Sequence, residues 1–168
     1  ADHVVLGSVL LPGTAFVELA VCAADQVGCG RVEELVIHTP LILSADDIAN
    51  EPIDLQIVVA GAGNDRGRGF AVYSRAGADE TWTQHATGTL AEASAEPPEA
   101  DRSPTWPPDD AAPVEIDGFY DDLAAAGFGY GPAFRGLRAV WRHNDDVYAD
   151  VTVPGTPAST EFGVHPAL

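Results

Sequence analysis

Cysteine is scarce in this sequence, and its two cysteines do not form a recognisable pair. Cys22 and Cys29 are the only cysteines among 168 residues. Their spacing matches neither a Cys-x-x-Cys redox pair nor half of a zinc site, and two cysteines cannot build a disulfide framework. We therefore expect two thiols in a reducing compartment.

Basic residues are also few. The 8 basic residues are all arginines, and they stand against 26 Asp and Glu residues, which gives a net charge of −18. The electrostatic field of a protein with this negative charge repels nucleic-acid phosphates and anionic lipid headgroups. The charge therefore argues against nucleic acid and against a membrane surface as partners.

Long apolar runs are absent from the sequence. No stretch of about 18 apolar residues could span a bilayer, and no basic segment followed by an apolar one opens the chain. We therefore expect a cytoplasmic protein. The chain begins abruptly at Ala1-Asp2-His3 and ends without a polar tail, so we expect a piece truncated at both ends, inactive on its own.

The first regular element that the sequence predicts is a buried helix over residues 12–28. With 46% apolar residues the chain belongs to the globular class. Apolar side chains recur at helical spacing, and glycines follow where the helix should end. These apolar residues are Phe16, Leu19, Ala20, Ala23 and Val27. Glu18 is the only charge before Asp25, so other structure should cover most sides of the helix.

Antiparallel strands are predicted after this helix. Apolar and polar residues alternate over 32–37, 53–59, 70–75 and 82–90, and turn-rich stretches separate these segments. One buried helix followed by such strands is typical of an α+β fold in which an antiparallel sheet wraps around a central helix.

A proline-rich stretch divides the chain. Six prolines between residues 92 and 113 break any regular element, which indicates a linker. A helix near 119–126 and strands near 137–142 and 147–153 follow, and His165-Pro166 should open another helix. We therefore divide the chain into an N-terminal lobe (1–95), a linker (96–113) and the beginning of a second lobe (114–168).

The first group of residues that could carry chemistry is His3 and the Pro12-Gly13 step. Free N–H groups in the first turn of a helix carry a partial positive charge and can polarise a carbonyl. A neutral imidazole beside them can accept a proton near neutral pH. Taken alone, the pattern favours a structural histidine near a strand for His3.

The second group is the glycine-rich stretch 127–134, which holds Tyr130 in a constrained turn. Glycine and proline are common in the loops of all proteins, so spacing alone favours a tight structural loop.

Together these segments resemble the dehydratase domain family of modular polyketide synthases and the related fatty acid synthases. Residues 3–13 match the family's motif of a histidine, a glycine four positions later and then Pro-Gly. Residues 130–134 match its Tyr-Gly-Pro-x-Phe signature. Residues 162–168 are similar to the stretch that leads to the family's catalytic aspartate.

The resemblance implies a double hotdog fold, with the active site between two lobes. It implies that this chain holds the first lobe and part of the second. By the same resemblance His3 is the catalytic base, the N–H of Gly13 holds the thioester carbonyl, and Tyr130 and Pro132 contact the substrate. The aspartate that protonates the leaving hydroxyl would follow Leu168.

The implied reaction removes water from a β-hydroxyacyl thioester to give an α,β-unsaturated thioester. The resemblance implies no cofactor and no metal, because the substrate is carried on the phosphopantetheine arm of an acyl carrier protein. It also implies neighbouring synthase domains and a homodimer in the parent synthase. Arg135 or Arg138 could give the acidic carrier a local positive spot.

Two other readings stay open at this point. The same proton abstraction could shift a double bond or support cyclisation, or the chain could be a non-catalytic structural or dimerisation element. The remaining histidines His38, His85 and His143 have no metal-ligand spacing and are expected to be structural. The three Asp-Asp pairs are expected to be solvated: Asp109-Asp110, Asp121-Asp122 and Asp145-Asp146.

Overall fold

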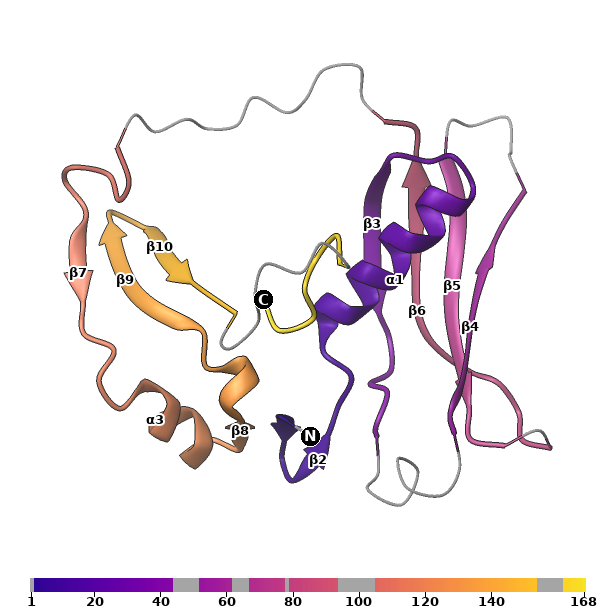
Figure 1. Ribbon diagram of the computed structural model, residues 1–168, viewed down its shortest axis with the longest axis horizontal. Helices are drawn as coiled ribbons and strands as arrows, with labels where there is room; N and C mark the ends of the chain where they lie inside the picture. Colours follow the sequence, from indigo (N-terminus) through magenta and orange to yellow (C-terminus); the bar gives the residue numbers. More distant parts are fainter. Residues whose placement is uncertain (1, 44–51, 62–66, 78, 94–104, 154–161) are drawn as a thin grey trace.

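In the described part of the N-terminal half, an antiparallel sheet packs against a long helix (Figure 1). The computed structural model describes residues 2–43, 52–61, 67–77, 79–93, 105–153 and 162–168. Helix α1 spans Gly13–Gln26, and the four strands have the order β3-β6-β5-β4. Their bounds are β3 Arg31–Ile37, β4 Asp54–Val59, β5 Gly67–Arg75 and β6 Thr83–Ala91.

Small side chains let α1 lie close to this sheet. Ala20 and Ala24 are buried beside Phe16, and the sheet contributes Val72 and Leu90 to the same core. A Cβ at Gly88 of β6 would lie 2.5 Å from Cε1 of Phe70. Glycine at this position therefore gives the aromatic ring room in the core.

A second, smaller sheet joins distant parts of the chain. Strand β1 (His3–Val5) pairs with β2 (Ser8–Val9) on one side and with β8 (Phe128–Tyr130) on the other. Leu6 and Gly7 connect β1 to β2 with φ angles of 48° and 83°. Two positive φ angles in a two-residue loop define the type I′ turn, which matches the twist of the strands.

The second lobe contains a three-stranded sheet and two short helices. The strand order is β10-β9-β7, with bounds β7 Ala112–Val114, β9 Leu137–His143 and β10 Asp146–Val151. Helix α3 spans Phe119–Ala125, and the 3₁₀ helix η1 spans Pro132–Phe134. Trp106 packs edge-on against Tyr148, with ring centroids 5.7 Å apart, and so rests on this sheet.

The predicted long elements are all present within a few residues of their expected bounds. The buried helix is α1, and the six predicted strands are β3, β4, β5, β6, β9 and β10. Leu55 of β4 is exposed, although it shares the strand face of Ile57, which packs on the core. The short strands β7 and β8 were not predicted.

Three other expectations meet a mixed result. The helix predicted to open at His165-Pro166 stays a prediction: residues 166–167 form a turn, in which the N–H of Leu168 donates to the carbonyl oxygen of His165 at 3.0 Å. The expectation that other structure covers α1 on most sides needs correction at Cys22, which is exposed.

The division of the chain into an N-terminal lobe (1–95), a linker (96–113) and a second lobe (114–168) stays a prediction. Most of the expected linker, residues 96–104, lies outside the described part. Near its end, β7 already pairs with β9 from Ala112.

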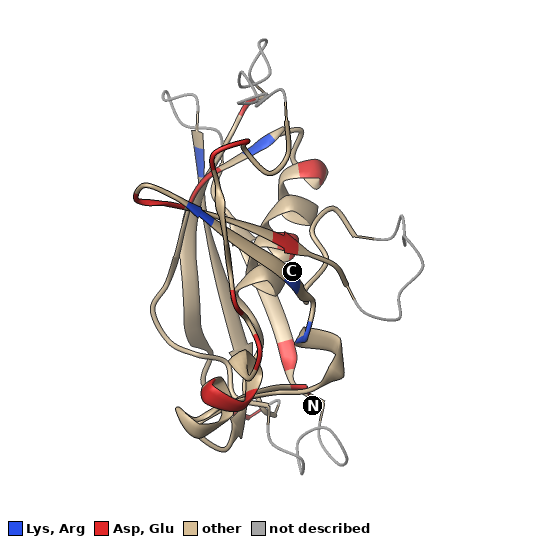
Figure 2. Cartoon of the chain, turned by 90° about the vertical axis from the view of Figure 1, so that its left-hand side faces the viewer, with Lys and Arg blue, Asp and Glu red and all other residues tan. Residues whose placement is uncertain are grey.

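Helices long and apolar enough to cross a bilayer are absent from the described ranges. The three Asp-Asp pairs are exposed, as predicted. Figure 2 shows acidic residues spread along the turns of the second lobe and on α3, with few basic segments between them.

Candidate functional site

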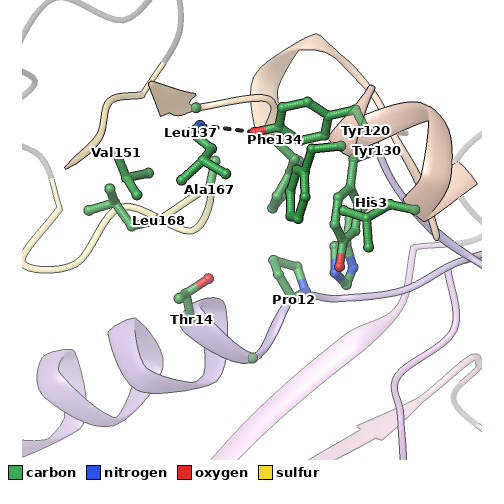
Figure 3. Close-up of a pocket in the computed structure, with 14 residues that line it drawn as sticks. His3, Pro12, Thr14, Tyr120, Tyr130, Phe134, Leu137, Val151, Ala167 and Leu168 are labelled. Atoms are coloured by element: carbon green, nitrogen blue, oxygen red, sulfur yellow. Dashed lines mark hydrogen bonds between the residues drawn. The ribbon is translucent and has the colours of Figure 1, made fainter. Parts of the chain in front are cut away.

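A cavity of about 590 Å³ lies where the two lobes meet. The first lobe contributes β1 and the start of α1, and the second lobe contributes α3, β8, η1 and the ends of β9 and β10. Figure 3 shows these side chains converging from the two sides. The lining residues are His3, Pro12, Gly13, Thr14, Phe119, Tyr120, Leu123, Tyr130, Phe134, Gly136, Leu137, Val151, Ala167 and Leu168.

His3 reaches the cavity from β1 in a fixed orientation. Its Nδ1 lies 3.0 Å from the carbonyl oxygen of Leu10, and the N–H of Leu10 donates to the carbonyl oxygen of His3, also at 3.0 Å. A carbonyl oxygen can only accept, so Nδ1 carries the proton. Nε2 is therefore left with the lone pair, which is the arrangement that a general base needs.

Two aromatic rings hold the imidazole in place. The ring of Tyr130 stacks on His3 with centroids 5.5 Å apart and planes inclined by 11°. The ring of Phe134 lies at 5.1 Å. Tyr130 is also the residue opposite His3 in the pairing of β1 with β8, so the backbone register brings the two side chains together.

Asp2 connects β1 to the turn that carries these rings, and sequence reasoning missed it. Its carbonyl oxygen accepts the N–H of Gly131 at 2.8 Å, and its Oδ2 accepts the N–H of Ala133 at 3.1 Å. The only signal in the sequence is an aspartate directly before the histidine, and that signal is weak among 26 acidic residues.

Gly13 begins α1 at the edge of the same cavity. Pro12 precedes it with φ −68° and ψ 152°, an extended conformation that ends at the first helical turn. Among the described residues, no side chain caps this turn. The first N–H groups of a helix have no partner within the helix and bear its positive pole. Both Gly13 and His3 line this cavity, so the positive end of α1 and the imidazole lie at the same site.

The other two predicted site residues differ in their placement. Tyr130 lines the cavity, whereas Pro132 is not among the lining residues and instead opens η1. Its ring fixes the backbone at the start of η1, the helix that presents Phe134 to His3. The roles of His3, Gly13, Tyr130 and Pro132 stay predictions.

Helix α3 also lines the cavity, and its contribution was not predicted from the sequence. Phe119, Tyr120 and Leu123 line the cavity, and the Tyr120 hydroxyl accepts the N–H of Leu137 at 2.9 Å. Among the described lining residues there is no carboxylate. In the part of the chain that the structure describes, no three His, Cys, Asp or Glu side chains lie close enough to hold a metal ion.

Two of the three histidines assigned to structural roles have ordinary hydrogen-bond partners. Buried His85 directs Nδ1 to the carbonyl oxygen of Thr39 at 3.1 Å, and the Ser74 hydroxyl lies 2.7 Å from its Nε2. The Nε2 of His38 lies 2.7 Å from Oγ1 of Thr87. Both imidazoles are therefore satisfied inside the first lobe, away from the cavity.

Solved structures with this arrangement define the class of fold. The chain superposes with a TM-score of 0.88, at 42% identity, on a dehydratase from a study of the borrelidin and fluvirucin polyketide synthases, covering 100% of this chain and 60% of that one. The erythromycin dehydratase gives 0.86 at 38% identity, with 99% and 60% covered. An ambruticin dehydratase-cyclase domain gives 0.84 at 45% identity, with 99% and 57% covered. The fold is a hotdog, a sheet wrapped around a helix, with part of a second lobe.

Sequence comparisons narrow the class to one family. Residues 1–75 match the polyketide synthase dehydratase domain, and residues 98–168 match the polyketide synthase dehydratase N-terminal domain. The chain is 50% identical to polyketide synthase GfsA of Streptomyces halstedii and 48% identical to the pikromycin synthase component PikAII of Streptomyces venezuelae. It covers 2% and 4% of those proteins, while 100% of the chain is matched. The chain belongs to the dehydratase domain family of modular polyketide synthases.

Proposed function

We propose that the protein containing this chain is a 3-hydroxyacyl-[acyl carrier protein] dehydratase, a hydro-lyase. The observation that carries the proposal is the convergence of His3 and the N-terminus of α1 on one largely apolar cavity between the lobes. Family membership supports the same reaction. The substrate is a β-hydroxyacyl thioester, and the products are an α,β-unsaturated thioester and water.

His3 is proposed to begin the reaction by taking a proton from the α-carbon. Its Nδ1 is engaged with the carbonyl of Leu10, so Nε2 is the atom that accepts the proton. The electron pair of the Cα–H bond forms the Cα–Cβ double bond, and the Cβ–O bond breaks. The stacked ring of Tyr130 restrains the imidazole, which keeps the lone pair directed at the substrate.

The N–H of Gly13 is proposed to hold the thioester carbonyl. Negative charge grows on that oxygen as the α-proton leaves. A preorganised donor at the positive end of a helix stabilises this charge without having to reorganise. The proposed reaction consists of two proton transfers and the cleavage of one C–O bond, with no net oxidation or reduction, so the proposed mechanism uses no cofactor.

The leaving hydroxyl needs a proton to depart as water. No described lining residue is a carboxylate, so we assign this proton to the aspartate that follows the His165-Pro166-Ala167-Leu168 motif in the family. The turn at residues 166–167 brings Ala167 and Leu168 to the cavity, which supports an acid arriving from that direction.

We further propose an acyl carrier protein and neighbouring synthase domains as partners, within a homodimeric synthase of the cytoplasm. Arg138 is an exposed cation near the cavity, and its Nε–H donates to Oγ1 of Thr152 at 2.8 Å. Arg135 instead donates to the carbonyl of Tyr130 at 2.7 Å, so a change there also disturbs the site. Arg138→Glu should weaken carrier binding without altering turnover of a small thioester mimic.

A matched control for this partner test is Arg31→Glu, because Arg31 is also exposed but lies in the first lobe, where it pairs with Glu33 at 3.1 Å. Carrier binding should be unaffected by this change. Equal losses of carrier binding in the two variants would remove Arg138 from the docking surface.

A second candidate activity is suggested by the ambruticin neighbour, which is described as a bifunctional dehydratase-cyclase domain. A cyclising or isomerising protein would begin with the same proton abstraction. Incubating the full-length protein with β-hydroxyacyl carrier protein and identifying the product distinguishes the three reactions. The non-catalytic reading predicts no product at all.

His3→Ala tests the proposed base directly. General-base catalysis contributes about 10²–10⁴-fold, and dehydration should fall by that factor while the protein stays folded. A variant that dehydrates the carrier-bound substrate at the wild-type rate would end the catalytic assignment.

A further inference from the structure

Glu18 is a nearly buried carboxylate at the centre of α1 that the proposed chemistry does not use. The residue is 8% exposed. Its Oε2 accepts the N–H of Val164 at 2.7 Å, and its Oε1 accepts the N–H of Gly163 at 3.1 Å. These donors lie near the far end of the sequence, in the segment 162–168 that runs beside α1 (Figure 1). One side chain therefore connects the first lobe to the C-terminal segment.

The ionised form of this carboxylate is the one that makes the connection. The hydrogen bond from Val164 is the largest influence, and it lowers the pKa of Glu18 below its usual 4.5; burial opposes it, and the Gly163 bond adds to it. The thiol of Cys22 also lies 3.6 Å from Oε1. Partial desolvation and the neighbouring Glu18 charge raise the pKa of that thiol, so it stays protonated and donates.

Thr14 makes a second connection one helical turn earlier. Its Oγ1 donates a hydrogen bond to the carbonyl oxygen of Pro166. Residues four apart lie on the same face of a helix, so Thr14 and Glu18 form one surface that holds the segment. Ala167 and Leu168 follow this contact and line the cavity beside Thr14 (Figure 3). The held segment is therefore a wall of the proposed active site.

The backbone of the segment approaches α1 closely at Gly163. A Cβ at this position would lie 3.2 Å from Cγ1 of Val21 and 3.3 Å from Oε2 of Glu18, tighter than ordinary contact. A carboxylate taken out of water is costly unless hydrogen bonds replace its solvation, and here two backbone N–H groups do so. Apolar packing could bury the same surface, but it would not fix the segment at two defined backbone atoms.

We propose that Glu18 is a positioning residue for the reaction: it fixes segment 163–168 on α1 so that Ala167 and Leu168 keep the cavity wall in the geometry that turnover requires. This role rests on the proposed dehydratase function. Glu18 does not line the cavity, so it acts on the reaction through the segment and not through the substrate.

The test is Glu18→Gln in the full-length protein, with three readouts. The amide keeps the size of the side chain but turns an NH₂ group toward one of the two backbone donors. Amide hydrogen exchange at Gly163 and Val164 should become faster. The kcat for dehydration should fall by about tenfold to a hundredfold, because a displacement of about 1 Å can cost that much. The melting temperature should fall modestly at neutral pH, because the charge-assisted part of these two hydrogen bonds is lost.

The control is Cys22→Ala, which removes the thiol contact to Oε1 but leaves both backbone bonds in place. It should change neither exchange nor kcat. Gly163→Ala disturbs the same contact from the segment side while Glu18 stays intact. Gly163→Ala should also lower kcat. This variant tests the positioning role if Glu18→Gln does not fold.

The outcomes separate this role from the proposed function. Faster exchange with unchanged kcat in an active protein overturns the positioning role, as does a lower melting temperature with unchanged kcat. Unchanged exchange shows that Glu18 does not hold the segment and also overturns it. Absence of dehydration in the wild-type protein overturns the proposed function, whereas the exchange experiment still decides whether Glu18 holds the segment.

Discussion

Gly131→Ala should destabilise the turn that carries the rings around His3. A Cβ at Gly131 would lie 2.5 Å from Cγ of Asp2 and 2.8 Å from its Oδ1. The carboxyl group of Asp2 is held by the N–H of Ala133, so it cannot turn away without losing that bond. The added methyl group therefore competes directly with the contact between β1 and η1.

The cost follows from the hydrogen bond that is lost. Bonds to charged groups contribute about 1.5–3 kcal/mol, and partial exposure lowers this figure, so we expect a loss of about 1–2 kcal/mol. Gly129→Ala is the matched control in the adjacent strand, because its Cβ would meet Cβ of Val4 at an ordinary 3.5 Å. In a strand the change from glycine to alanine should be neutral or stabilising by up to about 1 kcal/mol.

Urea unfolding of both variants, each also made with Asp2→Ala, measures the effect as a double-mutant cycle. Removing the Asp2 carboxyl group removes the obstacle, so Gly131→Ala should then cost little, with a coupling of about 1–2 kcal/mol. Equal costs for the two glycine substitutions, or a Gly131→Ala cost that Asp2→Ala leaves unchanged, would refute the reasoning.

Three further predictions concern stability. Leu90 is 0% exposed, so Leu90→Ala should lower the free energy of unfolding by about 2–5 kcal/mol, and a loss below 1 kcal/mol in urea would contradict the described core. Leu6 has a φ of 48° and is 81% exposed, so Leu6→Asn should raise the melting temperature, with a gain of up to about 1 kcal/mol. The hydrogen bond from Val164 lowers the pKa of Glu18, so its contribution to stability is complete above the unfolded pKa and is lost as the pH falls through the folded pKa. Glu18→Gln should remove the part of the acid-induced loss of stability that comes from Glu18. A variant whose stability falls below pH 5 in the same way as that of the wild-type protein would contradict this prediction.

The elements that the sequence predicted are those stabilised by local pattern. Helix α1 has apolar side chains at helical spacing, and β5 and β6 have long alternating stretches that pack on it. Each of these elements buries one face against the same core. A periodic pattern in one stretch of sequence therefore predicts both the element and its buried side.

The short strands of the site depend on partners far along the chain. Strands β1 and β8 have three residues each, and His3 pairs with Tyr130 across most of the sequence. Such short segments carry no measurable periodicity, and only the fold brings them together. The family resemblance compensated for this, because it identified both segments as parts of one site.

Asp2 and Glu18 were missed for a related reason. Each carboxylate accepts hydrogen bonds from backbone N–H groups more than a hundred positions away. Backbone donors exist at almost every residue, so the sequence near the acceptor or the donor gives no sign of the bond. In the sequence, Glu18 was only the single charge of an apolar helix before Asp25. The hydrogen bonds from Gly163 and Val164 explain how a carboxylate is accommodated in that helix.

The claim at the centre of this account is that the N–H of Gly13 polarises the thioester carbonyl beside His3. Gly13→Pro deletes this N–H while proline suits the first turn of a helix, and Gly13→Ala keeps the N–H, with Cδ1 of Ile37 at an ordinary 3.6 Å from the new methyl group. Removing one such donor should lower kcat for dehydration by about 10²–10³-fold in Gly13→Pro relative to Gly13→Ala. Equal kcat values in these two folded variants would contradict the claim.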